Sequence, residues 1–164
     1  MPDMWPIEGP QSLMLQDLRE LHHSLRALMQ EHRALCEAPS PDSHALGHIR
    51  WRLAHSSRQR MTFLHDVVFV TAERHADVPG AADMLSYKAA LPAYRQRIST
   101  FLARWPMDAI IAEWSLYRAE SARFRPEIHR MLQTEDLFLS RLEGGLATSG
   151  RIEPLRPTIA LQAR

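Results

Sequence analysis

Histidines are the residues of this sequence with the widest range of possible chemistry. Imidazole titrates near neutral pH and binds transition metals, so histidines gathered in one part of a fold can hold a metal or transfer protons. The chain has nine: His22, His23, His32, His44, His48, His55, His65, His75 and His129. None falls between residues 76 and 128, so a metal site would have to draw its imidazoles from the remaining parts of the chain.

The short histidine motifs do not make a site by themselves. His44 and His48 stand four residues apart and would share a helix face, but two imidazoles are too few ligands for structural zinc. We expect this pair, and the adjacent His22 and His23, at the surface. The sequence also lacks a glycine-rich phosphate loop, a cysteine pair and a recognisable Ser/His/Asp signature, so it indicates no class of enzyme.

Charge and composition argue against several classes of protein. The 20 Lys and Arg residues almost cancel the 19 Asp and Glu residues, so we expect no nucleic-acid partner. No apolar run is long enough to span a bilayer, and the first residues do not resemble a secretory signal, so we expect a soluble cytoplasmic protein with no membrane contact. The lone Cys36 cannot form an internal disulfide, and its helical spacing with Met29 and His32 predicts a small buried side chain.

Apolar periodicity predicts an all-α fold. Apolar residues make up 45% of the chain and glycines number only six, a balance that favours helix over sheet. Apolar side chains at three-and-four spacing predict a first helix over 12–37 and a second over 44–75, separated by a turn with two prolines.

The second half of the chain predicts two more helices. The third ends at Trp105, and Pro92 either kinks it or marks its start. The fourth runs from 106 to 143 and is stopped by Gly144-Gly145. Short connections favour antiparallel neighbours, hence an up-down-up-down four-helix bundle over 12–143, with an N-terminal arm at 1–11 and a flexible tail at 144–164.

Four segments, one in each predicted helix, carry a resemblance to a known family. They are Leu18–Met29, Arg50–Ala54, Phe101–Pro106 and Thr134–Leu139. Together they resemble the hemerythrin-like (HHE cation-binding) domains over residues 12–143. The resemblance implies a diiron site in the bundle core. That family takes one His from the first helix, His-x-x-x-Glu from the second, His from the third, and His with a carboxylate from the fourth, because residues four apart share a helix face.

Most of the ligands that the resemblance implies are missing. The third helix has no histidine. One register of the other helices gives His55 with Gln59 and His129 with Gln133, but a helical wheel turns both histidines away from the apolar stripes, so we expect both to be exposed.

A second register, which the wheel favours, places Arg60 and Leu64 at the expected His and Glu of the second helix. In the fourth helix it gives Arg130, Thr134 and Glu135. Only His22 and Glu135 would then remain as ligands. These two residues cannot hold two irons beside an arginine, since the cation repels metal. An interior ion pair between Arg60 and Glu135 is the expected replacement.

Other polar side chains are also predicted to face inward. On the wheel His32 lies closer to the centre of its apolar stripe than His22, so we expect His32 to be the better buried. His65, Tyr94 and Glu120 should fall at similar heights. They would form either a hydrogen-bonded network or a mononuclear metal or small-ligand site, with Tyr94 as a phenol donor or ligand.

These features favour a hemerythrin-like protein that has lost the diiron site and acts as a metal-independent binding or regulatory module without a cofactor. The alternative is an iron-binding, oxygen-linked protein with a non-standard ligand set. A protein partner would need exposed apolar side chains, for which the candidates are Trp5, Trp51, Phe69 and Trp114.

Overall fold

All regular structure in residues 10–151, the part of the chain that the computed structural model describes, is helical; side chains are described from residue 16 onward. The prediction of an all-α protein is therefore confirmed. The elements in chain order are α1 (Pro10–Cys36), α2 (Ser43–Phe63), the π-helical turn η1 (Leu64–Val68), α3 (Phe69–Arg74), α4 (Ala81–Arg104), α5 (Met107–Ala112) and α6 (Trp114–Thr148).

The second predicted helix forms as one continuous rod made of α2, η1 and α3. It begins where Asp42 accepts a hydrogen bond from the backbone N–H of Ala45 at 2.9 Å, an N-cap that satisfies one of the free donors of the first turn. The π-turn η1 lengthens the hydrogen-bonded repeat from four residues to five. Side-chain directions beyond Leu64 therefore depart from those of an uninterrupted α-helix.

Pro92 lies within α4, eleven residues after its first residue, Ala81, so it does not mark the beginning of that helix. The predicted fourth helix is interrupted at Glu113, whose φ of −123° and ψ of 44° are not helical. The short helix α5 therefore precedes the long helix α6. The indole N–H of Trp114, the first residue of α6, donates to the Ala38 carbonyl oxygen at 3.2 Å and ties the start of α6 to the α1–α2 connection.

The prediction that Gly144-Gly145 ends the last helix is wrong, because α6 continues to Thr148. Gly145 allows the α3–α4 connection to pack closely against α6. A Cβ on it would lie 2.4 Å from the Pro79 carbonyl oxygen. Gly80, with φ of +90°, approaches the same helix, and a Cβ on it would lie 2.4 Å from the backbone nitrogen of Leu142. The two glycines let the α3–α4 connection rest directly on α6.

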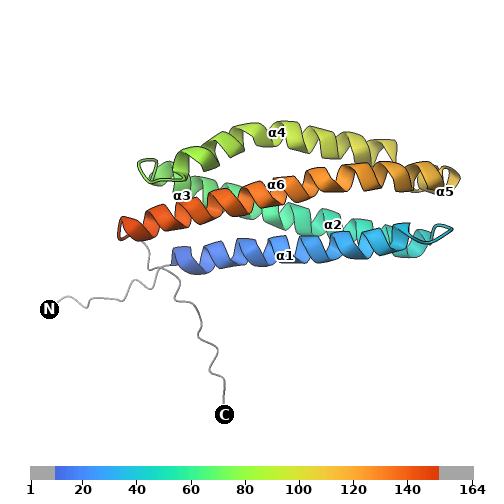
Figure 1. The fold of residues 1–164 in the computed structure, drawn as a ribbon, viewed down its shortest axis with the longest axis horizontal. Coiled ribbons are helices and arrows are strands. Elements are labelled where there is room, and N and C mark those ends of the chain that lie inside the picture. The colour runs from blue at the N-terminus through green and yellow to red at the C-terminus, as the bar shows by residue number, and fades with distance from the viewer. Residues whose placement is uncertain (1–9, 152–164) are drawn as a thin grey trace, which may run out of the picture.

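The long helices lie lengthwise beside one another (Figure 1). Helices α1 and α6 run antiparallel, because Arg19 near the start of α1 bonds Glu143 near the end of α6, while His32 bonds Tyr117 at the opposite ends. Helices α4 and α6 are also antiparallel, as ion pairs join Asp83 to Arg141 and Arg104 to Glu120.

The buried apolar side chains form two separate clusters. The larger one, which we call the main core, is drawn from α1, η1, α3, α4 and α6 and includes Leu18, Leu25, Leu64, Val68, Leu91, Leu132 and Leu139. The smaller one, the end core, contains Cys36, Leu46, Trp105, Ile110, Trp114 and Tyr117. Burial of Cys36 agrees with the expectation from its spacing, and burial raises the pKa of its thiol. The two cores leave space between them.

Within residues 10–151, no helix has both the length and the apolar character that crossing a membrane would demand. The predicted arm at 1–11 lies almost wholly, and the part of the predicted tail from 152 to 164 entirely, outside the described residues, as does Trp5. Residues 144–148 of that predicted tail belong to α6.

Candidate functional site

A buried ion pair crosses the interior from α2 to α6. Arg60 Nη1 donates to Glu135 Oε1 at 2.7 Å, and the two side chains are 2% and 0% exposed. The hydroxyl of Tyr87, from α4, donates to the same carboxylate oxygen. Burial, and then the negative charge of Glu135, raise the pKa of that phenol, which is therefore a neutral donor. The interior ion pair predicted between Arg60 and Glu135 is confirmed.

His22 extends this network across to α1. Its Nε2 lies 2.7 Å from Glu135 Oε2, and its Nδ1 lies 2.5 Å from Asp136 Oδ1. Arg26, one helical turn along α1, also donates to Asp136. Burial raises the pKa of Asp136, but the hydrogen bonds from Arg26 and His22 outweigh it and hold that pKa below its ordinary value. Both imidazole nitrogens of His22 therefore lie within hydrogen-bonding distance of a carboxylate oxygen on α6.

The donors of this network do not fit a diiron centre. Both oxygens of Glu135 are already bound, one to Arg60 and Tyr87 and the other to His22. A guanidinium also occupies the position where a metal site needs an anionic or neutral ligand. Among the residues that the structure describes, no group of three or more His, Cys, Asp or Glu side chains is arranged to hold a metal ion.

The relative burial of the two α1 histidines is the reverse of the prediction. His22 is fully buried, whereas His32 is only half-buried, and the expectation of His22 at the surface is wrong as well. The wheel found the apolar face of α1 correctly but said nothing about the partners on α6. The carboxylates of Glu135 and Asp136 supply the hydrogen bonds that allow imidazole to be buried there.

The predicted cluster of His65, Tyr94 and Glu120 does not form. His65 is exposed and packs edge-on against Phe69 within its own rod, while Tyr94 packs near Tyr87. Glu120, on α6, accepts from the Trp105 indole N–H at 2.9 Å, at the end of α4. Trp105 follows Tyr94 by eleven residues, which is roughly 16 Å along the helix, so Glu120 lies far from Tyr94. The π-turn η1 contributes to the error for His65, because the wheel assumed a regular α-helix through it.

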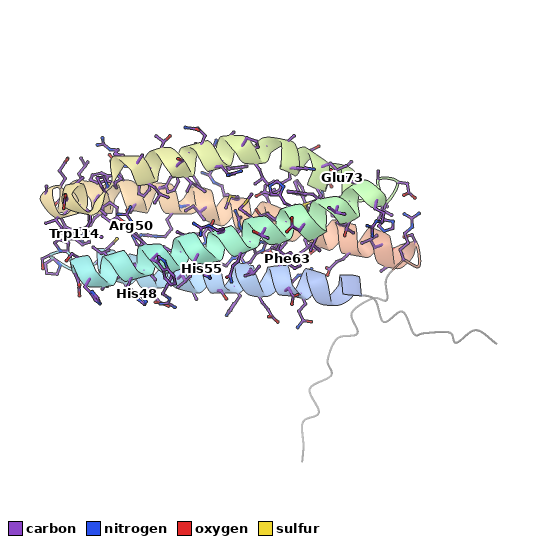
Figure 2. The ribbon with its side chains drawn as sticks, turned by 180° about the vertical axis from the view of Figure 1, so that it is seen from behind. His48, Arg50, His55, Phe63, Glu73 and Trp114 are labelled. Carbon is purple, nitrogen blue, oxygen red and sulfur yellow. The ribbon has the colours of Figure 1, made fainter. Side chains whose placement is uncertain are left out.

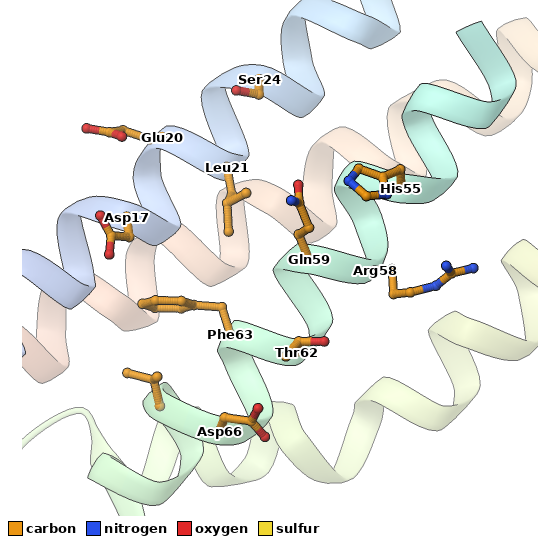
Figure 3. Close-up of a pocket in the computed structure, with 11 residues that line it drawn as sticks. Asp17, Glu20, Leu21, Ser24, His55, Arg58, Gln59, Thr62, Phe63 and Asp66 are labelled. Carbon is orange, nitrogen blue, oxygen red and sulfur yellow. The ribbon is translucent and has the colours of Figure 1, made fainter. Parts of the chain in front are cut away.

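His55 and Gln59, the metal-ligand positions of the first register, are both exposed on the surface of α2. Both residues line a shallow groove between α1 and α2 with a volume of about 660 Å³, together with Asp17 and Glu20 (Figure 3). His55 also stacks on Trp51, which is 64% exposed. His48 and His55 are both exposed along α2 (Figure 2), and His129 is half-buried.

Of the described aromatic candidates for a partner surface, only Trp51 is exposed. Phe69 is fully buried and Trp114 is 8% exposed, so the expectation that either lies outside the core is wrong. Their side chains belong to the two cores described above.

A cavity of about 300 Å³ separates the main core from the end core. Its apolar wall comes from α1, α2, α4 and α6 and includes Leu25, Met29, Leu53, Ile98, Phe101, Leu102, Phe124, Ile128 and Met131. Its polar wall consists of His32, Arg50, Ser57, Arg60, Tyr117, Ser121 and Arg125. Arg60 thus belongs both to the buried network and to the cavity wall.

His32 and Tyr117 form the polar end of this cavity beside the end core. His32 Nε2 lies 2.7 Å from the Tyr117 hydroxyl. Burial, and then the guanidiniums of Arg125 and Arg50, lower the pKa of His32 to about 4, and burial raises the pKa of Tyr117. Both rings are consequently uncharged at neutral pH, and the positive charge of the cavity resides on the arginines.

The sequence did not reveal three members of the network. Local patterns did not single out Tyr87, Arg26 or Asp136. The available signal was local: Arg26 lies four residues after His22 and Asp136 lies next to Glu135, so both flank predicted inward positions.

Comparisons of this chain with models of protein families, with curated proteins and with solved structures found no match.

Proposed function

We propose that this protein is a metal-independent binding module with a hemerythrin-like, up-down four-helix bundle, in which the network around Glu135 replaces a diiron site. The buried ion pair between Arg60 and Glu135 is the observation that carries the proposal. The Arg60 guanidinium is 2% exposed and bonded to the fully buried Glu135 carboxylate. It occupies the interior space beside that carboxylate and balances its negative charge, as a metal ion would in a diiron site.

The cavity beside this network supplies the binding function. The cavity lies between the two cores and is partly open to solvent, so its volume of about 300 Å³ can admit a small molecule. That volume is at the lower end of the range for small-molecule sites, and the wall combines an apolar surface with a few polar groups, as such sites do. A ligand here would bridge the two cores and stabilise the contact between them, which suits a regulatory role.

Metal content tests the first half of this proposal. The protein is expressed with added iron and zinc, purified without chelator, and its metals are quantified by mass spectrometry beside the Glu135→Gln variant. We expect less than about 0.1 metal ion per chain in both proteins, since Glu135 has no free oxygen to offer. Stoichiometric iron or zinc in the wild-type protein that disappears in Glu135→Gln would overturn metal independence.

Blocking the cavity tests the second half. Ser121 is 5% exposed and lines the cavity, so Ser121→Leu should fill it, whereas Ala122→Leu adds the same side chain at an exposed neighbouring position. Octan-1-ol, an uncharged probe, should raise the melting temperature of wild-type protein and of Ala122→Leu but not of Ser121→Leu. An equal response of all three proteins would place binding elsewhere and contradict the proposal.

A further inference from the structure

The charge of the cavity wall has one sign. As far as the structure describes the chain, the wall contains three arginines, Arg50, Arg60 and Arg125, and no aspartate or glutamate. Of these three, only Arg60 has a carboxylate partner among the residues that the structure describes. Arg50 and Arg125 come from α2 and α6, are each half-buried, and form no ion pair with any described side chain.

Unmet hydrogen-bonding capacity adds to this charge. Arg60 Nε is buried and has no hydrogen-bond partner within the described part of the chain, and neither has the buried hydroxyl of Ser121 on the same wall. Buried polar groups are almost always paired, so donors left free beside a cavity indicate a group that accepts hydrogen bonds from them. Because guanidinium only donates, that group must be an acceptor.

The remainder of the wall is apolar and sets the shape of the rest of the ligand. Phe101 and Phe124 stack at 4.5 Å between ring centroids and line the cavity together with Met29 and Met131. A volume of about 300 Å³ accommodates about ten groups of the size of a water molecule or a methylene. The space suits a short alkyl chain or a single aromatic ring.

From this arrangement we propose that the cavity binds a small organic anion: a monocarboxylate with an apolar body, its carboxylate among Arg50, Arg60 and Arg125 and its body against the phenylalanine and methionine side chains. Planar guanidinium groups bind carboxylates in paired hydrogen bonds, which favours this head group over a hydroxyl or an amine. The inference rests on the cavity-binding function proposed above and specifies the class of its ligand.

Three probes of equal length test the charge preference on the wild-type protein: octanoate, octan-1-ol and octylammonium, each titrated by calorimetry at pH 7.5. We expect octanoate to bind at least about tenfold more tightly than octan-1-ol, and octylammonium to bind least. Equal affinity for octanoate and octan-1-ol, or tighter binding of octylammonium, would overturn the anion inference while leaving cavity binding intact. Failure of all three to bind would overturn cavity binding itself.

Matched arginine variants test where the carboxylate lies. Arg50→Gln and Arg125→Gln should each weaken octanoate binding by about five- to tenfold and leave octan-1-ol binding unchanged. Arg58→Gln and Arg123→Gln, exposed on the same two helices and outside the cavity wall, serve as controls and should bind octanoate as the wild-type protein does. If the control variants lose as much affinity as the cavity variants, the carboxylate is held elsewhere and the assignment is wrong.

Discussion

Replacement of Glu135 by glutamine removes the negative charge on which three other side chains converge. Glu135 accepts from Arg60 and Tyr87 on one oxygen and bonds His22 on the other, and its side chain is fully buried. The glutamine amide keeps the shape but leaves the guanidinium of Arg60 buried without a counter-charge. Breaking a buried pair by neutralising one partner costs about 3–5 kcal/mol, a large share of the roughly 5–15 kcal/mol by which domains are stable.

Urea unfolding followed by circular dichroism measures this loss. With a slope of about 2 kcal/mol per molar urea, a loss of about 4 kcal/mol lowers the midpoint by about 2 M. The matched control is Asp83→Asn, which breaks the exposed pair with Arg141 and should change the free energy of unfolding by less than about 1 kcal/mol.

A double variant separates loss of pairing from loss of packing. In Arg60→Met with Glu135→Leu both charges are gone and the volume is largely kept, so the part of the loss in Glu135→Gln that comes from the unpaired guanidinium should return, while Tyr87 and His22 still lack their acceptor. A midpoint for Glu135→Gln within about 0.5 M urea of the wild-type value would refute the reasoning. Neutralising a buried, paired carboxylate should lower the free energy of unfolding by more than so small a shift represents.

Other perturbations test separate parts of the account. The pKa of His32 falls from 6.5 to about 4 on folding, so between these pH values the unfolded chain takes up a proton that the folded protein does not. The free energy of unfolding should therefore fall by about 3 kcal/mol from pH 7 to 4. Urea titrations at each pH should show that His32→Gln removes this share of the pH dependence. An unchanged pH dependence in the variant would show that His32 is not buried as a neutral ring. Gly145→Ala should destabilise by at least about 2 kcal/mol, since its Cβ meets backbone at 2.4 Å, whereas Gly144→Ala, in open space, should be neutral or stabilising by calorimetry; similar melting temperatures would argue against the close approach. Tyr87→Phe should cost about 1.5–3 kcal/mol in urea unfolding by removing a hydrogen bond to the charged Glu135, and no measurable cost would place that hydroxyl in water.

Local sequence patterns predicted the helices well. Periodic apolar residues located the long helices, and the proline-containing turn placed the start of α2 closely. The end of α6 was missed because Gly145 reads as a helix stop in sequence, whereas its role is contact with the α3–α4 connection. That contact joins residues far apart in the chain and leaves no local signal.

The buried network shows the same division between local and long-range information. The wheel correctly turned Arg60 and Glu135 inward, because each lies on the apolar face of its own helix. It ranked His32 above His22 in burial because it could not see that Asp136 and Glu135 on α6 face His22. Burial of a polar side chain depends on its partners, and these come from a helix more than a hundred residues away.

The central claim is that the ion pair of Arg60 and Glu135 stands in place of a metal site. Whether iron binds among His22, Arg60 and Glu135 tests that claim most directly. Crystals grown from protein prepared with excess ferrous iron, with diffraction recorded on both sides of the iron absorption edge, report it directly. We expect the guanidinium of Arg60 in contact with Glu135 and no anomalous density between the helices. Anomalous peaks beside His22 and Glu135, with Arg60 turned away, would contradict it.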